Sequence, residues 1–229
     1  VAQIGTLGTI AEGYCQEKTL TTPDPIALHK VLFDLHQKGF THIVMEASSH
    51  AIDQSRVADV DFNFTVFTNL SPEHLDYHGT MADYFQAKLK LFTALPRTAT
   101  AIVNMETDYG QAIFDKCAVP VVTTALEKTG DVFFKDYQIS LAGIRGTIQA
   151  GEITYTVDSL LIGKFNAENI LCAIATGNAM GLTQNAIKNG LKQCANIPGR
   201  MESFALRSGA TALIDYAHTP AAYDKVLST

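Results

Sequence analysis

The sequence predicts an α/β fold: a doubly wound, mostly parallel sheet that carries a small antiparallel β meander. Short apolar runs alternate with amphipathic helical patterns up to Thr124, which is the order of parallel strands joined by crossover helices. Polar residues follow the ends of several of these runs, where ligands bind in open α/β sheets. From Asp131 to Asp158 the pattern changes to alternating and β-branched segments separated by glycines, which indicates antiparallel strands.

Bulk composition narrows the class of protein. The 229 residues, 47% of them hydrophobic, suffice for one large domain or two smaller ones. A net charge of -6 without a basic run argues against nucleic acid or an anionic membrane as a partner. No apolar run is long enough to span a bilayer, and we identify no signal peptide. Four scattered cysteines without a CxxC pair indicate the ordinary thiols of a cytoplasmic protein.

The first elements are read from local signals. Residues 1–4 form a predicted strand, and the turn at 5–9 is rich in glycine and threonine. That turn lacks the GxxxxGK[ST] pattern and its lysine, so we interpret it as a turn rather than a phosphate loop. Asp24 is a good N-cap, Pro25 a good first helical residue and Gly39 a good stop, which predicts a helix ending near residue 38.

The later elements follow the same logic. Further parallel strands are predicted at residues 41–47, 63–68, 100–104 and 119–124, and a helix begins near Gly79. Two helices are predicted at 167–180 and 183–193, then strands at 201–205 and 212–215 and a last helix after Pro220. The break at 198–200 predicts a domain boundary, with residues 1–198 in one domain and 199–229 in the next.

The segment after the strand at 63–68 holds the most potential chemistry. Glu73, His74, Asp76 and His78 lie within about eight residues of that strand's end, where they could act as ligands or acid–base groups. They could equally form a solvated polar loop that caps the next helix.

Lys88 lies on the predicted inward face of that next helix. The other residues of this face are apolar or aromatic: Tyr84, Ala87, Leu91 and Phe92. Because an isolated buried ammonium is costly, Lys88 is expected to be paired, neutral or chemically modified. The alternative is that its ammonium reaches out to water.

Other polar groups also lie at element ends. Glu46 closes the strand at 41–47 and is followed by two serines, His50, Gln54 and Arg56, a plausible metal and phosphate arrangement in which Arg56 could fork onto a phosphate. Thr21 and Thr22 precede the first helix and could hold a phosphate or sugar, or only satisfy loop backbone. Asn166 and Asn169 could likewise hold a ligand or cap a helix.

Taken together, these stretches resemble the Mur ligase family of peptidoglycan synthesis, and within it the type that makes the UDP-N-acetylmuramoyl-tripeptide. The residues that carry the resemblance are Thr21-Thr22-Pro23, Glu46-Ala47-Ser48-Ser49-His50 with Gln54 and Arg56, the stretch 68–79, Ala87-Lys88, Gly163 with Asn166 and Asn169, Gly199-Arg200-Met201-Glu202, and Asp215-Tyr216-Ala217-His218-Thr219-Pro220. They cover the chain from end to end. The stretch 68–79 followed by Ala-Lys is the most specific of them.

The resemblance implies an activity. It implies an ATP-dependent amide ligase that adds the third amino acid, diaminopimelate or L-lysine, to UDP-MurNAc-L-Ala-D-Glu through an acyl phosphate. ATP is the implied co-substrate and Mg²⁺ the implied cofactor of a cytoplasmic, monomeric enzyme of cell-wall biogenesis. The sequence does not indicate which amino acid is added.

The resemblance also implies roles for individual residues. Glu46, His74 and Lys88 are implied as catalytic, and the implied metal site comprises Glu46, His74, Glu73 and a carbamylated Lys88. Mg²⁺ prefers oxygen ligands, so His74 is the less obvious member. The implied substrate-binding residues are Thr21, Thr22, Ser48, Gln54 and Arg56, and the implied nucleotide-binding residues are Asn166, Asn169, Arg200 and Asp215.

By this resemblance residues 1–198 are the central, ATPase-like domain and 199–229 the start of the C-terminal domain. We expect the uridine-binding domain, a GTNGKT-like phosphate loop upstream of Val1 and most of the C-terminal domain to lie outside this chain, so the chain alone should be inactive. Two alternatives stay open: a folylpolyglutamate synthetase-like ligase, or a non-catalytic substrate-binding domain. The sequences Asp-Tyr-His-Gly and Asp-Tyr-Ala-His-Thr-Pro favour the muramoyl ligase.

Overall fold

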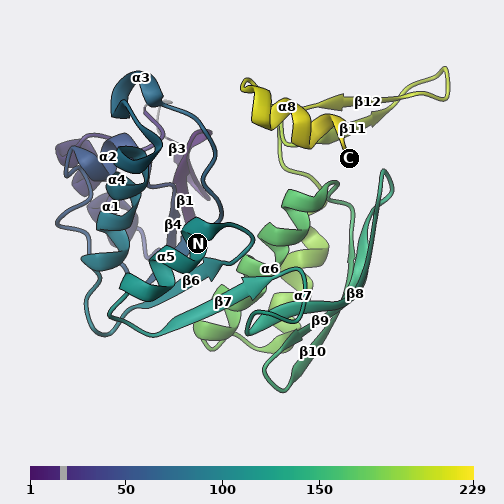
Figure 1. Ribbon diagram of the computed structural model, residues 1–229. Helices are drawn as coiled ribbons and strands as arrows, with labels where there is room; N and C mark the ends of the chain where they lie inside the picture. The colour runs from purple at the N-terminus through teal and green to yellow at the C-terminus, as the bar shows by residue number, and fades with distance from the viewer. Residues whose placement is uncertain (16–19) are drawn as a thin grey trace. The chain divides into compact units, whose positions relative to one another are not determined.

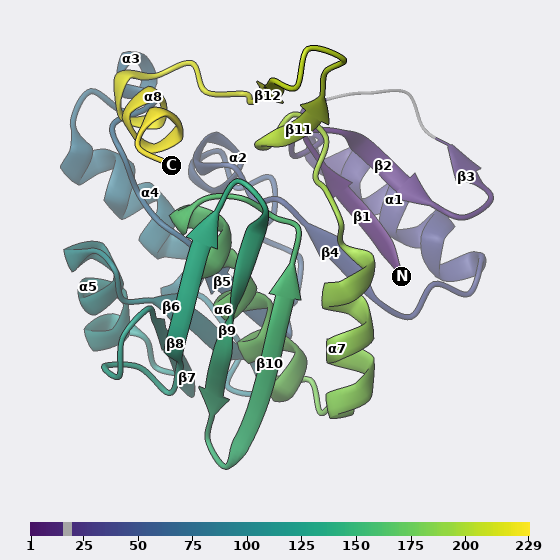
Figure 2. The same ribbon diagram turned by 90° about the vertical axis from the view of Figure 1, so that its right-hand side faces the viewer.

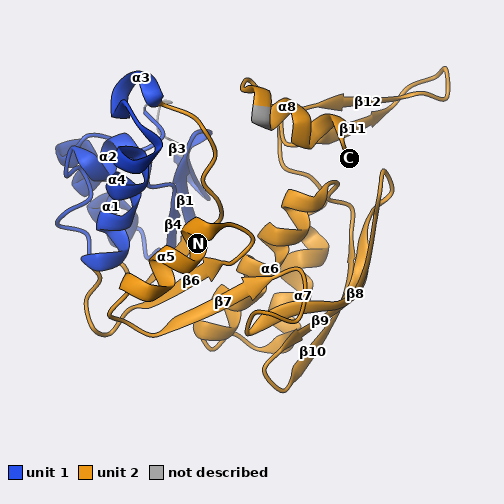
Figure 3. Ribbon diagram, in the orientation of Figure 1, with its two compact units in different colours: residues 1–61, 75–94 blue, residues 62–74, 95–229 orange. Residues whose placement is uncertain are grey.

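The computed structural model describes residues 1–15 and 20–229 (Figure 1). The chain divides into two compact units, which Figure 3 colours separately. Unit 1 comprises Val1–Asp61 and Leu75–Ala94, and unit 2 comprises Phe62–His74 and Leu95–Thr229. These units are defined by contacts between residues and do not test the domain boundary expected near residue 198, which stays a prediction.

Unit 1 contains a four-stranded sheet in the order β3-β2-β1-β4. The strands are β1 (Ala2–Gly5), β2 (Gly8–Ala11), β3 (Tyr14–Cys15) and β4 (Ile43–Met45). β1 pairs antiparallel with β2 and parallel with β4. Gly5 lies opposite Gly8, so the predicted turn is confirmed as a tight hairpin turn, and Gly8 has a φ of 93° that favours glycine. Neither β2 nor β3 was predicted.

The helices of unit 1 are α1 (Pro25–Gln37), α2 (Ser49–Asp53), α3 (Leu75–His78) and α4 (Met81–Thr93). The predicted ends of α1 are confirmed: an Asp24 carboxylate oxygen accepts the Ala27 N–H at 3.0 Å, and Gly39 follows with a φ of 83°. Leu28, Val31 and Leu35 are buried on one face of α1, whereas Ile26 is 84% exposed at the first turn.

The helix predicted after Gly79 is α4, which begins at Met81 with the Thr80 hydroxyl as its N-cap. Its buried residues are Tyr84, Phe85, Ala87, Leu89 and Phe92. The inward face is therefore broader than the predicted stripe. Lys88 lies at its margin and is half-buried rather than enclosed.

Unit 2 contains a six-stranded sheet in the order β10-β9-β8-β7-β6-β5. Its strands are β5 (Phe64–Phe67), β6 (Thr100–Asn104), β7 (Val121–Ala125), β8 (Val132–Ser140), β9 (Gly143–Ala150) and β10 (Ile153–Ser159). The strands from β5 to β8 are parallel, and β8, β9 and β10 form an antiparallel meander that Figure 2 shows side by side. The predicted fold class is confirmed, although its parallel strands are divided between two sheets.

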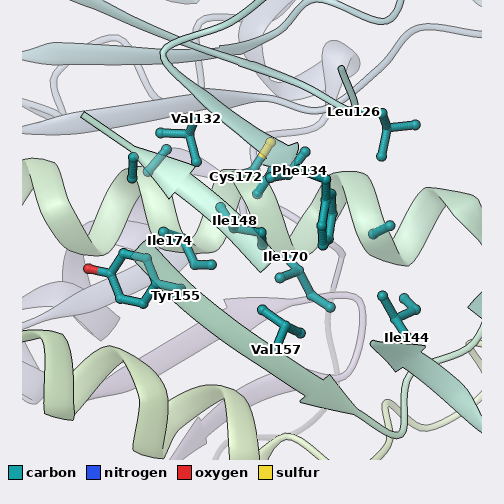
Figure 4. Close-up of a cluster of buried hydrophobic side chains, with 14 of the residues drawn as sticks. Leu126, Val132, Phe134, Ile144, Ile148, Tyr155, Val157, Ile170, Cys172 and Ile174 are labelled. Atoms are coloured by element: carbon teal, nitrogen blue, oxygen red, sulfur yellow. The ribbon is translucent and has the colours of Figure 1, made fainter. Parts of the chain in front are cut away.

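The core of unit 2 lies between its sheet and helix α6 (Lys164–Ala179). Figure 4 shows this cluster, in which Ile148, Tyr155 and Ile174 are fully buried and the Tyr155 hydroxyl donates to Asn178 Oδ1. Cys172 belongs to the same cluster, and burial raises the pKa of its thiol to about 11. Among the described side chains, Cys172 and Cys194 are free thiols, as expected.

Three further helices and a small sheet complete unit 2. The helices are α5 (Asp108–Lys116), α7 (Gln184–Gln193) and α8 (Pro220–Leu227), and β11 (Glu202–Ala205) pairs antiparallel with β12 (Thr211–Ile214). β11, β12 and α8 match the strands and last helix expected after residue 200. In the described part of the chain, no helix combines the length and apolar character needed to cross a membrane.

Candidate functional site

The carboxyl ends of β1 and β4 in unit 1 bring Glu46 and two threonines together. The Thr6 hydroxyl donates to Glu46 Oε2 at 2.7 Å, and the same hydroxyl lies 3.2 Å from Thr21 Oγ1. Gly5 makes room for this arrangement, because a Cβ atom there would clash with the Glu46 carboxylate. Glu46 is therefore exposed yet held in place at a strand-end edge that can bind a ligand.

Thr22 has a different surrounding from Thr21. Its side chain is buried, and its hydroxyl donates to the Glu46 carbonyl at 2.7 Å and accepts the Ser48 N–H at 3.0 Å. Its own carbonyl accepts a hydrogen bond from Arg56 Nη1 at 3.2 Å. The Thr22 hydroxyl thus satisfies loop backbone, one of the two roles that the sequence left open, and its contact with a substrate stays a prediction.

Helix α2 positions three of the predicted substrate-binding residues. The Ser48 hydroxyl caps α2 by accepting the Ala51 N–H at 3.2 Å, and Gln54 follows the last turn. Gln54 Oε1 accepts a hydrogen bond from Arg56 Nε at 3.0 Å. The structure therefore brings Thr22, Ser48, Gln54 and Arg56 together within one unit.

Aromatic rings line the adjoining part of unit 1, where α2, α3 and α4 meet. His50 and Tyr77 have ring centroids 4.2 Å apart, and His78 stacks on Tyr84 at 5.0 Å with 19° between the planes. His78 Nε2 also lies 2.9 Å from the hydroxyl of Ser49.

Lys88 shares this environment. Its Nζ atom lies 5.3 Å from the Tyr84 ring centroid, a cation–π distance that favours a positive charge. The predicted catalytic lysine therefore lies in the same unit as Glu46, half-buried beside an aromatic ring.

Glu73 and His74 belong to unit 2, in the loop after β5. His74 has a φ of 58°, a left-handed conformation that is uncommon for residues other than glycine and gathers at functional sites. Its Nε2 atom lies 3.8 Å from Glu73 Oε1, and His218 Nε2 lies 3.1 Å from the same oxygen. Within neither unit do the described residues form a group of three or more His, Cys, Asp or Glu side chains arranged to hold a metal ion.

Asn104 anchors the start of that loop. It is buried at the end of β6, and its Nδ2 donates to the Thr68 carbonyl at 2.7 Å and to Glu168 Oε2 at 3.0 Å. Burial raises the pKa of Glu168, although the bond from Asn104 opposes the shift. The sequence analysis assigned no role to Asn104 or Glu168. The feature that could have indicated a role is the polar residue Asn104 at the carboxyl end of a predicted strand.

The predicted nucleotide-binding residues lie in two places of unit 2. Asn166 is buried in the first turn of α6, where its Nδ2 donates to the Ile162 carbonyl at 2.8 Å and its Oδ1 accepts from Asn169 at 3.3 Å. The helix was expected to begin at residue 167, but α6 begins at Lys164. Neither asparagine is its N-cap, so the capping alternative is wrong.

Arg200 and Asp215 lie around β11 and β12. The Arg200 guanidinium lies 5.5 Å from the Tyr216 ring centroid. The Asp215 carboxylate accepts the backbone N–H groups of Met201 and Ala217 at 2.9 and 2.8 Å. Asp215 therefore ties the entry of β11 to the exit of β12.

Comparison with known proteins places this arrangement in a family. Residues 1–177 match the family model described as the Mur ligase middle domain. The chain belongs to the Mur ligase family. This confirms the resemblance on which the predicted site residues rest.

Relatives and solved structures of this family agree in both sequence and fold. The chain is 39% identical over 99% of its length to the UDP-N-acetylmuramoyl-L-alanyl-D-glutamate–2,6-diaminopimelate ligase of Geobacter metallireducens, of which it covers 46%. A solved structure of a ligase of the same name matches with a TM-score of 0.82 and 31% identity over 100% of this chain and 47% of that one. The chain therefore spans less than half the length of these relatives.

The alternative ligase class is the less similar one. Folylpolyglutamate synthase of Mycobacterium tuberculosis, complexed with ADP, matches with a TM-score of 0.69 and 21% identity over 86% of this chain and 44% of that one. At this identity the likeness shows a common fold alone. The muramoyl type of Mur ligase is the better match.

Proposed function

We propose that the complete protein containing this chain is an ATP-dependent ligase that joins diaminopimelate to UDP-MurNAc-L-Ala-D-Glu. The observation that carries the proposal is 39% identity over 99% of the chain to a ligase named for that reaction. ATP would phosphorylate the terminal carboxylate of the dipeptide, and the amine of the added amino acid would displace the phosphate from the acyl phosphate. We place this reaction in the cytoplasm and expect a monomer.

Unit 1 offers a recognition surface for the anionic UDP-muramoyl substrate. Arg56 has five N–H donors, of which three are engaged by Gln54 and the Thr22 carbonyl. The other donors suit a phosphate or carboxylate, which a guanidinium binds in a fork. Ser48 and Thr21 lie on neighbouring segments of this surface and could add hydroxyl contacts.

A magnesium ion fits part of the proposed ligand set. Glu46 and Glu73 offer the carboxylate oxygens that Mg²⁺ prefers, and a carbamate on Lys88 would add two more oxygens, whereas the His74 nitrogen is a less usual ligand. Bound magnesium would neutralise the charges of the facing phosphate and carboxylate. Glu46 would be kept in place for that role by Thr6 and by the space at Gly5.

The nucleotide would lie along unit 2. The exposed Asn169 amide in the second turn of α6 and the Arg200 guanidinium beside the Tyr216 ring are suited to hydrogen bonding and stacking with a base or ribose. Asn166 is bonded to the Ile162 carbonyl and to Asn169, and Asp215 is bonded to two backbone N–H groups. We therefore expect these two residues to hold the nucleotide-binding segments in place rather than to contact the nucleotide.

The test is phosphate release from ATP by the complete protein, with UDP-MurNAc-L-Ala-D-Glu and diaminopimelate present together and each omitted in turn. L-lysine in place of diaminopimelate tests the added amino acid, and a folate with glutamate tests the alternative ligase class. Release that needs both muramoyl dipeptide and diaminopimelate supports the proposal. Release with the folate pair alone would replace it.

Variants test the proposed residues in the same assay. Glu46→Ala and His74→Ala should each lower turnover by orders of magnitude with little change in melting temperature, because both side chains are exposed and pack little. Glu152→Ala and His36→Ala are the matched controls, since these residues are exposed, lie outside the proposed site and make no side-chain hydrogen bond among the described residues. Retained activity with a lowered melting temperature would show that the site is misplaced.

A further inference from the structure

A directed series of hydrogen bonds crosses unit 1 from α4 to Arg56. The Lys90 ammonium lies 2.7 Å from Asp53 Oδ1, and Asp53 Oδ2 accepts a hydrogen bond from the Tyr77 hydroxyl at 3.1 Å. The Tyr77 oxygen accepts from Gln54 Nε2 at 3.2 Å, and Gln54 Oε1 accepts from Arg56 Nε at 3.0 Å. Helices α2, α3 and α4 thus each contribute a side chain to this series of hydrogen bonds, which ends at the Arg56 guanidinium.

Donor and acceptor chemistry determines the direction of every bond in this series. A guanidinium only donates, so Gln54 must turn its oxygen to Arg56 and its amide nitrogen to Tyr77. The Tyr77 oxygen accepts from that nitrogen, which leaves its single hydrogen for the Asp53 carboxylate. Hydrogen bonds from Lys90 and then Tyr77 lower the pKa of Asp53, so this carboxyl stays ionised and accepts only.

We propose that Tyr77 and Asp53 are positioning residues for the UDP-muramoyl substrate: through Gln54 they fix the orientation of the Arg56 guanidinium that binds it. The inference rests on the proposed function, which gives Arg56 its anionic ligand. A guanidinium held before the substrate arrives loses less conformational entropy on binding, so the network increases affinity without touching the substrate.

The Arg56 contacts agree with this role. Nε and Nη2 face Gln54, and Nη1 faces the Thr22 carbonyl, so the guanidinium is held from two sides. Two of its five N–H donors make no hydrogen bond within the described part of unit 1. The Gln54 oxygen, which accepts two of the three bonds, and the Thr22 carbonyl together set the direction of these two donors.

A purely structural brace is the competing explanation. Tyr77 and Lys90 both contact Asp53, so the same bonds also tie α3 and α4 to the end of α2. Breaking a brace lowers stability and affects all substrates alike. Breaking a positioning network raises the KM for one substrate and leaves turnover at saturation nearly unchanged.

The first experiment is Tyr77→Phe in the complete protein, which removes the hydroxyl and keeps the ring against His50. We expect the KM for UDP-MurNAc-L-Ala-D-Glu to rise about tenfold, with kcat and the KM for ATP changed less than about twofold. The matched control is Tyr137→Phe, since Tyr137 is a partly exposed tyrosine of unit 2 whose hydroxyl makes no hydrogen bond among the described residues. An unchanged KM for the muramoyl substrate in Tyr77→Phe would overturn the proposal.

Two further variants separate positioning from bracing. Asp53→Asn should raise the same KM, because an amide no longer attracts Lys90 as an ion and can reverse its bond to Tyr77. In an Arg56→Lys background, Tyr77→Phe should have little further effect, since the group it positions is gone. If Tyr77→Phe and Asp53→Asn both lower the melting temperature and kcat while the KM stays constant, the network is a brace only.

A spectroscopic measurement on the 229-residue chain is independent of catalysis. The Arg56 Nε–H resonance can be assigned by its loss in Arg56→Lys. Tyr77→Phe should shift this resonance and speed its hydrogen exchange, whereas Tyr137→Phe should leave it in place. A resonance that does not respond to Tyr77→Phe would overturn the positioning role. A resonance that responds in a protein without ligase activity would overturn the proposed function alone.

Discussion

His218 Nε2 lies 3.1 Å from Oε1 of Glu73, although the two residues are 145 positions apart in the chain. His218 follows β12, and Glu73 lies in the loop after β5, so the contact ties together two distant segments of unit 2. The other ring nitrogen, Nδ1, lies 2.8 Å from the Tyr216 carbonyl, which fixes the plane of the imidazole. Glu73, a proposed metal ligand, is therefore oriented by a residue outside its own loop.

This contact predicts how the enzyme depends on magnesium. His218→Ala should raise the Mg²⁺ concentration needed for half-maximal phosphate release by about 10- to 100-fold, the range that residues behind a metal ligand typically contribute. His36→Ala, which replaces an exposed histidine of α1, is the control. A magnesium dependence identical to that of the unchanged protein would show that His218 does not orient Glu73.

The sequence predicted those parts of the fold that depend on neighbours along the chain. The cap at Asp24, the stop at Gly39 and the extent of β6 (Thr100–Asn104) follow from local signals and are confirmed. The start of α6 at Lys164 was missed because its N-cap, Gly163, makes no side-chain bond and carries no usual capping signal. The strand β2 was missed because it begins at Gly8, inside the glycine- and threonine-rich segment that was interpreted as a turn, and β3 has only two residues.

The sequence proposed a set of site residues but not the contacts between them. Residues such as Gln54 and Arg56 were proposed because a family pattern extends along the sequence. Their link to Tyr77 joins positions 23 residues apart, and no local spacing reveals it. For Thr22 the sequence did offer the observed contact as one of two alternatives, because its buried hydroxyl bonds to loop backbone at Glu46 and Ser48.

Gly5 should be essential for the placement of Glu46. A Cβ atom at Gly5 would clash with Oε1 and lie 2.8 Å from Cδ of the Glu46 side chain, so Gly5→Ala must displace the carboxylate. We expect a large loss of turnover with a stability cost of only about 1–3 kcal/mol, because the exposed side chain can swing away. Phosphate release and urea denaturation measure the two effects.

Gly13→Ala is the control for alanine at a glycine with open space around it, although its φ of 67° adds local strain. Full activity in Gly5→Ala would contradict the proposed role of Glu46.

Glu168 should make the stability of unit 2 depend on pH. Burial raises its pKa above the ordinary value of 4.5, so the folded chain holds this proton to a higher pH than the unfolded chain. The free energy of unfolding that this group contributes is therefore present below pH 4.5 and is lost as the pH rises through the raised pKa. Glu168→Gln keeps an oxygen for Asn104 and removes the charge, so it should flatten this fall in urea-denaturation series. A steeper fall in the variant would show that the sign is wrong.

Lys88 is expected to carry a carbamate in the complete protein. The support is the resemblance to the Mur ligases and the place of Lys88 at the margin of the buried face of α4, whereas the Tyr84 ring, 5.3 Å from Nζ, favours the ammonium. In its neutral form the amine attacks carbon dioxide, a C–N bond forms, and the nitrogen releases a proton to solvent. The resulting carboxylate gives the lysine an oxygen group that can neutralise a magnesium ion. Incubation with ¹³C-labelled carbon dioxide should give a carbamate signal that is lost in Lys88→Ala.

Rescue by small carboxylates tests whether that carbamate takes part in the reaction. Lys88→Ala should nearly abolish ligation, because it removes the modified group and leaves a space beside Tyr84. Acetate or formate can enter such a space and supply the missing carboxylate, so either should restore part of the activity. Lys90→Ala is the matched control on the same helix: Lys90 is exposed and bound to Asp53, so its loss should raise the KM for the muramoyl substrate and show no carboxylate rescue. Normal turnover in Lys88→Ala would refute the carbamate, whereas equal rescue of both variants would mean that the added acids act elsewhere.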